Sequence, residues 1–100
     1  IGAYENQKET NTFEADLHKD LKLNPNPAQD FTQIQLDNEW KGKIKIELTD
    51  LQGRVLLAEQ AEKFNDSFQY ELQWSNIKTG VYLVKLSHDG VTINKPLIIQ

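Results

Sequence analysis

The sequence contains no cysteine, which excludes a disulfide framework and any metal site built on thiolates. This absence does not fix the compartment, because a cysteine-free domain tolerates both the cytosol and the cell envelope. The chain has 100 residues, enough for one compact domain and too few for two. A chain of this length buries roughly two-thirds of its unfolded surface. We therefore expect a single hydrophobic core that needs neither disulfides nor metal.

The sequence also lacks an excess of positive charge and any long apolar run. Its 11 Lys and Arg against 15 Asp and Glu give a formal net charge of −4, whereas nucleic-acid binding needs a basic surface that neutralises phosphates. A helix that crosses a membrane needs about 20 consecutive apolar residues, and apolar runs here, such as residues 81–84 and 97–99, are far shorter. We expect no nucleic-acid partner and no membrane span.

Residues 1–20 are polar and irregular. Five acidic residues stand against two lysines in this segment, and a surplus of charge with few apolar residues predicts an acidic linker. Phe13, Ala15 and Leu17 alternate with polar residues, so an extra edge strand at residues 12–18 is a second interpretation. No secretory signal peptide opens the sequence. Because it begins at Ile1 rather than Met, we interpret the chain as part of a longer protein, with any export signal upstream.

From residue 21 onward, apolar and polar residues alternate with a period of two, which is typical of strands with one buried face. The clearest runs are residues 21–23, 33–37, 43–48 and 68–74. Residues 56–64 (LLAEQAEKF) resemble a helix, but their turn-rich surroundings favour a strand that runs into a loop. About seven short strands at roughly ten-residue spacing predict an all-β, antiparallel, immunoglobulin-like sandwich. A small barrel is the alternative.

Two turns have sequences that specify their geometry. Asp50 and Gly53 are the first and fourth residues of a predicted type I turn, closed by a glycine in the left-handed region that forms a bulge. Asp89 and Gly90 predict a two-residue hairpin of type I′, because both central residues of that turn need a positive φ.

Residues that could support catalysis or metal binding are few and scattered. His18 lies in the acidic segment and His88 in a predicted hairpin, and no third ligand fits them, so we expect no metal and no cofactor. Ser87, His88 and Asp89 are consecutive, but neighbours in a strand point to opposite faces and cannot align as a triad. No nucleophile elbow or phosphate-binding glycine loop is present. We expect a domain that is not an enzyme.

The aromatic residues divide into core candidates and one ligand candidate. In the alternating pattern Trp74 lies on the same strand face as Phe68, Tyr70 and Leu72, so we expect it in the core. Tyr82 stands in an apolar run, and its hydroxyl needs a partner if it is buried. Trp40 has charged and glycine neighbours that are typical of a loop. Burial against the sheet edge is the first interpretation there, and stacking on a sugar is the second.

Four segments, taken in order, resemble the type A sorting domain of the type IX secretion system. Residues 21–30 (LKLNPNPAQD) are similar to its Tyr-Pro-Asn-Pro motif, with Asn24 in place of Tyr. Residues 46–55 (IELTDLQGRV) resemble its strand leading into Asp-x-x-Gly-Arg, and residues 77–86 (IKTGVYLVKL) resemble its Leu-x-x-Gly-x-Tyr strand. Residues 95–100 (KPLIIQ) resemble its basic-then-aliphatic terminus, with Pro96 in place of a second basic residue. The resemblance covers residues 21–100, which we take as the domain.

The resemblance implies a secretion signal. Such domains end exported proteins of the Bacteroidetes, carry the cargo from the periplasm through the type IX translocon with its outer-membrane shuttle, and are removed by a surface transpeptidase (sortase). The cargo is then bound for the outer-membrane surface or the extracellular space. The alternative is a non-catalytic carbohydrate-binding or adhesive sandwich on a surface protein, with Trp40 as the contact. A sorting signal is normally cut off, whereas a binding module must stay on the mature protein.

The candidate recognition residues lie in these four segments. For the Pro-Asn-Pro motif a rigid turn is the first interpretation and receptor contact the second, because proline fixes φ and removes an amide donor. For the terminal strand we expect an edge that a receptor can reach. The candidates are Pro25, Asn26, Pro27, Asp50, Gly53, Gly80, Tyr82, Lys95, Leu97, Ile98, Ile99 and Gln100.

Overall fold

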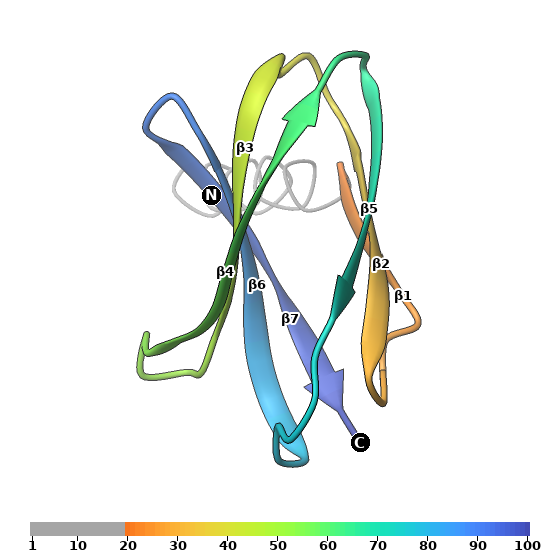
Figure 1. Ribbon diagram of the computed structural model, residues 1–100, viewed down its shortest axis with the longest axis vertical. Coiled ribbons are helices and arrows are strands. Elements are labelled where there is room, and N and C mark those ends of the chain that lie inside the picture. The colour runs from red at the N-terminus through yellow and green to blue at the C-terminus, as the bar shows by residue number, and fades with distance from the viewer. Residues whose placement is uncertain (1–19) are drawn as a thin grey trace, which may run out of the picture.

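The segments of alternating polarity fold as seven β-strands, as predicted. The structure is a computed structural model that describes residues 20–100, and this part of the chain contains no helix (Figure 1). The strands are β1 (Leu21–Asn24), β2 (Phe31–Asp37), β3 (Gly42–Thr49), β4 (Val55–Lys63), β5 (Ser67–Gln73), β6 (Gly80–His88) and β7 (Val91–Ile99). The predicted acidic linker and the possible strand at residues 12–18 lie outside the described residues.

The strands form two antiparallel sheets that pack face to face (Figure 1). One sheet has the order β1-β2-β5 and the other has the order β4-β3-β6-β7. The first, second and fifth strands thus lie together, as do the third, sixth and seventh, which is the division found in immunoglobulin-like domains. β4 joins β3 rather than β5. The predicted all-β, antiparallel sandwich is confirmed.

The same alternation builds the core between the sheets. In β3, Ile44, Ile46 and Leu48 are fully buried, whereas Lys43 and Lys45 point to solvent. Trp74 is 8% exposed, which confirms its predicted core position. The apolar core consists of Leu21, Leu23, Ala28, Ile34, Leu36, Ile44, Ile46, Leu48, Phe68, Leu72, Trp74, Val84, Leu86, Leu97 and Ile99.

The turns at Asp50–Gly53 and at Asp89–Gly90 both have the predicted geometry. Gly53 has a φ of +92° and its amide donates to the carbonyl of Asp50 at 3.1 Å, and the β3–β4 register shifts next to this turn. Asp89 and Gly90 have φ values of 48° and 80°, the paired positive values that a type I′ turn needs. These turns depend on local sequence, so they fix where β3–β4 and β6–β7 reverse direction.

The loops gather at two opposite ends of the sandwich (Figure 1). At the Asp20 end, the described chain begins with the carbonyl of Asp20 accepting from the amide of Asp37 at 3.0 Å. The β2–β3, β4–β5 and β6–β7 connections lie there. The other end, which we call the motif end, holds the β1–β2, β3–β4 and β5–β6 connections and residue Gln100.

Candidate recognition site at the motif end

The motif end brings together segments that lie far apart in the sequence. Ala28 forms a parallel bridge with Ile99, and Ile99 pairs on its other side with Gly80. Thr49, just before the β3–β4 turn, pairs with Leu83 of β6. The Pro-Asn-Pro segment, the Asp-x-x-Gly turn, the start of β6 and the end of β7 therefore share one end of the molecule (Figure 1).

The Pro-Asn-Pro segment lies along the outer edge of β7. The side chain of Asn26 donates from Nδ2 to the carbonyl of Pro96 at 3.0 Å and accepts from the amide of Ile98 on Oδ1 at 3.0 Å. Ala28 then continues as backbone, donating to the carbonyl of Ile98 at 2.8 Å and accepting from the amide of Gln100 at 2.7 Å. The amide of Asn26 thus presents a donor and an acceptor to β7 as a neighbouring strand would.

The terminal strand β7 lies at the edge of its sheet, and the last part of this edge is covered by the Pro-Asn-Pro segment. The backbone of residues 96–100 is hydrogen-bonded to β6 on one side and to residues 26–28 on the other. The side chains of Leu97 and Ile99 point into the core and are fully buried, while Ile98 is 43% exposed. This cover was not foreseen, because Asn26 lies some 70 residues away in sequence and nothing local indicates where its amide will bind.

The rest of the β1–β2 connection is fixed by its own bonds. Thr32, which is buried, donates from Oγ1 to the carbonyl of Pro25 at 2.8 Å. Trp74 donates from its indole nitrogen to the carbonyl of Gln29 at 3.0 Å, so this core residue also holds the loop. Pro27 is exposed between these contacts. The interpretation of the motif as a rigid turn agrees with this geometry.

Asp50 organises the β3–β4 turn through its carboxylate. Oδ1 accepts from the amides of Gln52 at 3.0 Å and Arg54 at 2.9 Å, and Oδ2 accepts from Nε of Arg54 at 3.1 Å. These bonds favour the charged form, so the amide of Arg54 above all holds the pKa of Asp50 below its ordinary value of 3.8. The Asp-x-x-Gly-Arg pattern therefore specifies a turn that is held by hydrogen bonds between its own residues.

Tyr82 at the start of β6 bonds back to the chain that leads into it. Its hydroxyl donates to the carbonyl of Lys78 at 2.6 Å, the geometry of the tyrosine corner of immunoglobulin-like sandwiches. A Cβ added at Gly80 would lie 3.5 Å from the Tyr82 ring, which is ordinary contact, and Gly80 has no positive φ. The partner expected for the hydroxyl is thus a backbone carbonyl, and the ring is half-buried against the core.

A shallow groove lies where the β3–β4 turn meets the β5–β6 connection. Its volume is about 380 Å³. Apolar side chains of Leu56, Ile77 and Tyr82 line it together with the charged groups of Arg54 and Lys78. The other lining residues are Asp50 and Asn76. The sequence predicted Asp50 and Tyr82 as candidates but missed the other members, because the groove forms only where the β3–β4 region packs beside the β5–β6 connection.

Lys95 is the candidate that the fold places elsewhere. Its Nζ donates to the carbonyl of Leu21 at 2.9 Å, across the gap between β7 and β1. Leu21 opens β1 near the Asp20 end, so this contact fastens the two sheets along their side. In this structure Lys95 joins β7 to β1 and does not line the motif end.

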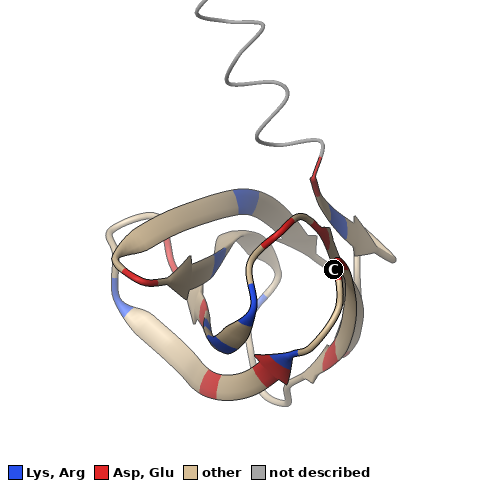
Figure 2. Ribbon diagram, turned by 90° about the horizontal axis from the view of Figure 1, so that it is seen from above, with Lys and Arg blue, Asp and Glu red and all other residues tan. Residues whose placement is uncertain are grey.

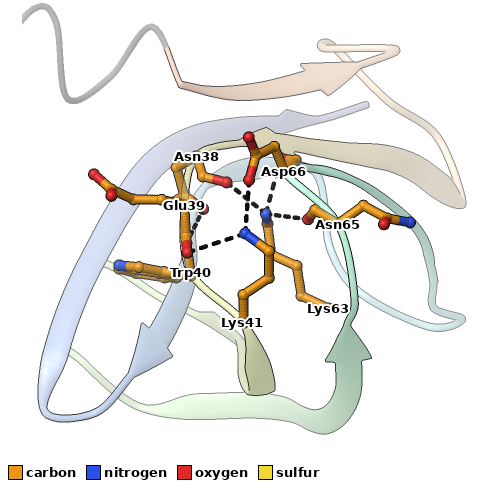
Figure 3. A network of polar contacts seen from close by, with 7 residues as sticks. All are labelled: Asn38, Glu39, Trp40, Lys41, Lys63, Asn65 and Asp66. Carbon is orange, nitrogen blue, oxygen red and sulfur yellow. Dashed lines mark hydrogen bonds and ion pairs between the residues drawn. The ribbon is translucent and has the colours of Figure 1, made fainter.

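The Asp20 end is built on a buried lysine (Figure 3). Lys63 is 1% exposed, and its Nζ donates to the carbonyls of Asn38 at 2.7 Å, Asn65 at 2.6 Å and Asp66 at 2.8 Å. Burial, with a smaller contribution from Lys41, lowers the pKa of Lys63. The three carbonyls come from both connections that cross between the sheets at this end, so one ammonium group fastens them together.

The aromatic and catalytic candidates at the Asp20 end have partners within the domain. The ring of Trp40 is half-buried against the core and lies 5.4 Å from the ring of His88. Nδ1 of His88 lies 3.1 Å from the carbonyl oxygen of Lys43, and the hydroxyl of Ser87 lies 3.0 Å from that of Thr92. Ser87 and His88 are therefore not hydrogen-bonded to each other as a triad requires.

Charged residues of both signs are interspersed along the described strands (Figure 2). Among residues 20–100, no group of three or more His, Cys, Asp or Glu side chains could hold a metal ion; His18 lies outside this range. The same part of the chain has no helix long and apolar enough to cross a membrane.

Comparison with known proteins identifies the family. No curated protein matches this chain. A family model described as "Secretion system C-terminal sorting domain" matches residues 22–100. These residues include all seven strands except the first residue of β1, and they contain every segment that meets at the motif end. The chain therefore belongs to the family of C-terminal sorting domains of the type IX secretion system, which act as tags on secreted cargo.

Proposed function

We propose that the export machinery recognises this domain at its motif end, and that a surface transpeptidase then separates it from the cargo. Domains of this family mark secreted proteins bound for the outer-membrane surface or the extracellular space. The partners in this proposal are the type IX translocon, its outer-membrane shuttle and the transpeptidase. On this reading the domain itself binds and does not catalyse.

The proposal rests mainly on the separation of the two ends. The sorting segments meet at the motif end, whereas the described chain begins at Asp20 on the opposite end (Figure 1). The longest dimension of the domain is 49 Å. Cargo that precedes Asp20 is thus attached away from the recognition site, so one domain can label many different cargoes without their covering it.

Removal of the domain requires a backbone that a protease can reach. From Leu21 onward the chain is held in strand ladders, which protect it from cleavage. Residues 1–20 have the charge surplus that is typical of a solvated linker. We place the transpeptidase site in or beside this segment.

The test is a reporter protein fused upstream of residues 1–100 and expressed in a bacterium with a type IX system. We expect the reporter at the cell surface in the parent strain and inside the cell in a strain without the translocon. A matched fusion carrying residues 1–20 alone should not be exported. Export that is independent of the domain or of the translocon would refute the sorting function.

Mass spectrometry of the surface reporter tests removal separately. We expect its C-terminus within or next to residues 1–20. A reporter that keeps residues 21–100 after export would contradict removal, and would favour the adhesive alternative if the retained domain also bound a glycan.

A further inference from the structure

The four edge strands of the sandwich differ in how their outer edges are covered. β7 contains Pro96 and is covered by residues 26–28, and β1 is four residues long with the carbonyl of Leu21 bonded to Lys95. β4 has nine residues, contains no proline, and is longer than the remaining edge strand, β5, which has seven. Natural proteins usually shield long edges because unpaired backbone groups accept a further strand. The outer edge of β4 is therefore the largest such opening in residues 20–100.

The hydrogen-bonding pattern shows which residues of β4 face outward. Pro96 and Ile98 direct their backbone groups away from the sheet, toward Asn26. Backbone groups alternate sides along a strand, so the registers across β6 and β3 assign every second residue of β4 to its free edge. These residues are Ala58, Gln60 and Glu62, and all three are exposed.

The inner face of β4 is fastened to the domain, so only its outer edge is open. Leu57 pairs with the buried Leu48. The hydroxyl of Tyr70 in β5 donates to the carboxylate of Glu59. This hydrogen bond, with burial as a second cause, raises the pKa of Tyr70 to about 12. β4 thus offers a fixed template, as strand addition requires.

The groove at the motif end lies beside the N-terminal end of β4. Arg54, just before β4, and Leu56, within it, line the groove together with Ile77, Lys78 and Tyr82. Arg54 contacts Asp50 through Nε, and its side chain is 77% exposed. The carboxylate of Asp50 is already bonded to two amides and to Arg54. Arg54 and Lys78 against Asp50 leave one net positive charge here, in a chain with a net charge of −4.

We propose that an extended segment of an export-machinery protein adds as a strand to the free edge of β4 and places a large apolar side chain, followed by a carboxylate, in the adjoining groove. The inference rests on the sorting function proposed above and extends its surface from the groove at the motif end along β4 toward the Asp20 end. Main-chain bonds to Ala58, Gln60 and Glu62 supply affinity, and the groove supplies specificity. The apolar side chain contacts Leu56, Ile77 and Tyr82. The carboxylate that follows it in the partner segment faces Arg54 and Lys78.

The first test removes one outward donor. Ala58→Pro deletes an amide that points away from the sheet, so it keeps the β3–β4 ladder but blocks strand addition. Asn94→Pro is the matched control, because the amide of Asn94 points outward from β7 by the same alternation. We expect Ala58→Pro to lower export of the reporter fusion by about tenfold or more, and Asn94→Pro to change it less than about twofold.

The second test addresses the groove and does not depend on proline being tolerated. Lys78→Glu reverses an exposed charge beside the groove while the Lys78 carbonyl stays available to Tyr82. Lys22→Glu, on the exposed face of β1, makes the same change of charge elsewhere. Lys78→Glu should reduce export several-fold and Lys22→Glu should not. Circular dichroism of each purified fusion checks that the domain remains folded.

A benzophenone amino acid at Gln60 identifies the occupant in the same cells. We expect a cross-link to a subunit of the translocon or to its shuttle, and none from the same probe at Asn94. Export of folded Ala58→Pro and Lys78→Glu fusions at the parent level, or a Gln60 cross-link only to a second copy of this domain, would overturn the inference. If the reporter is exported without the domain, the sorting function fails instead, so the two failures are distinct.

Discussion

The two ends of the sandwich are held together by opposite means. At the Asp20 end, the buried ammonium of Lys63 donates to three backbone carbonyls from two connections. At the motif end, the exposed amide of Asn26 and the carboxylate of Asp50 bond to backbone groups in place of a strand and a turn. The bonds of Lys63 are thus shielded from water, whereas those of Asn26 lie near solvent.

The difference follows from the cost of burying polar groups. A buried carbonyl without a partner costs about 1–3 kcal/mol, whereas an exposed one returns to water. Loss of Lys63 would orphan three carbonyls at a site where the side chain is 1% exposed. Loss of the Asn26 side chain would leave the carbonyl of Pro96 and the amide of Ile98 free to hydrogen-bond to water. We therefore expect substitutions at the two ends to differ in size.

The largest effect is expected at the Asp20 end. Lys63→Met keeps the apolar stem but removes the ammonium group, so we expect the free energy of unfolding to fall by about 3 kcal/mol or more. Lys41→Met, which removes the exposed ion pair with Asp66, should cost less than about 1 kcal/mol. Urea denaturation of the whole chain measures both. Equal effects of the two substitutions would break the comparison.

At the motif end, the turn at Gly53 should be the most sensitive position. Its φ of +92° is strained for a β-branched residue, so Gly53→Val should lower stability by about 1–3 kcal/mol. Gly80→Ala is the control, because Gly80 has no positive φ and its added Cβ meets Tyr82 at 3.5 Å. Thermal melting compares the two variants. An unchanged melting temperature for Gly53→Val would show that the turn adapts.

A smaller loss is expected at Asn26. Asn26→Ala removes two bonds to β7, and because both lie near solvent we expect a loss of about 1 kcal/mol. Hydrogen exchange gives the sharper reading, since the amide of Ile98 should lose protection while that of Ile46 in the core should not. Asn94→Ala on the same strand is the control. Retained protection at Ile98 would mean that the Asn26 contact does not hold the edge.

The smallest effect is a pH dependence that both ends share. The pKa of Asp50 is lowered chiefly by the amide of Arg54, and that of Asp66 by the side chain of Lys41. A carboxyl with a lowered folded pKa stabilises the fold above its ordinary value of 3.8, and this contribution is lost as the pH falls through the folded pKa.

Melting curves at decreasing pH should therefore show acid destabilisation that is smaller in Asp50→Asn and in Asp66→Asn than in the parent chain. If neither substitution weakens the acid dependence, these two carboxylates are not its source.

The features that sequence predicted are those in which neighbouring residues interact. Asp50 bonds to the amides two and four residues ahead, and Gly53 closes the same turn. The alternation of residues 43–48 assigns Ile44, Ile46 and Leu48 to one face whichever strand lies beside them. Such patterns carry their own geometry, so the strands, the turns and the sandwich class followed from them.

The candidate site was predicted only in part. The sequence named Asn26, Ile98 and Gln100, but not that Asn26 bonds to Ile98 or that Ala28 bonds to Gln100. It named Tyr82 without its bond to Lys78, and it gave no signal for Arg54, Leu56 and Ile77 as neighbours in one groove. The edge cover and the groove join segments far apart in the sequence, so they exist only after the sheets are assembled.

Sequence by itself determined that this chain forms an all-β domain with its turns at Asp50–Gly53 and Asp89–Gly90, because period-two burial and positive-φ turns are properties of short segments. The tertiary structure alone decided that Lys63 is buried beneath three carbonyls, that Asn26 closes one edge, and that β4 leaves another open. Each of these depends on which strands become neighbours. That choice is made by packing of the whole core, so no segment specifies it alone.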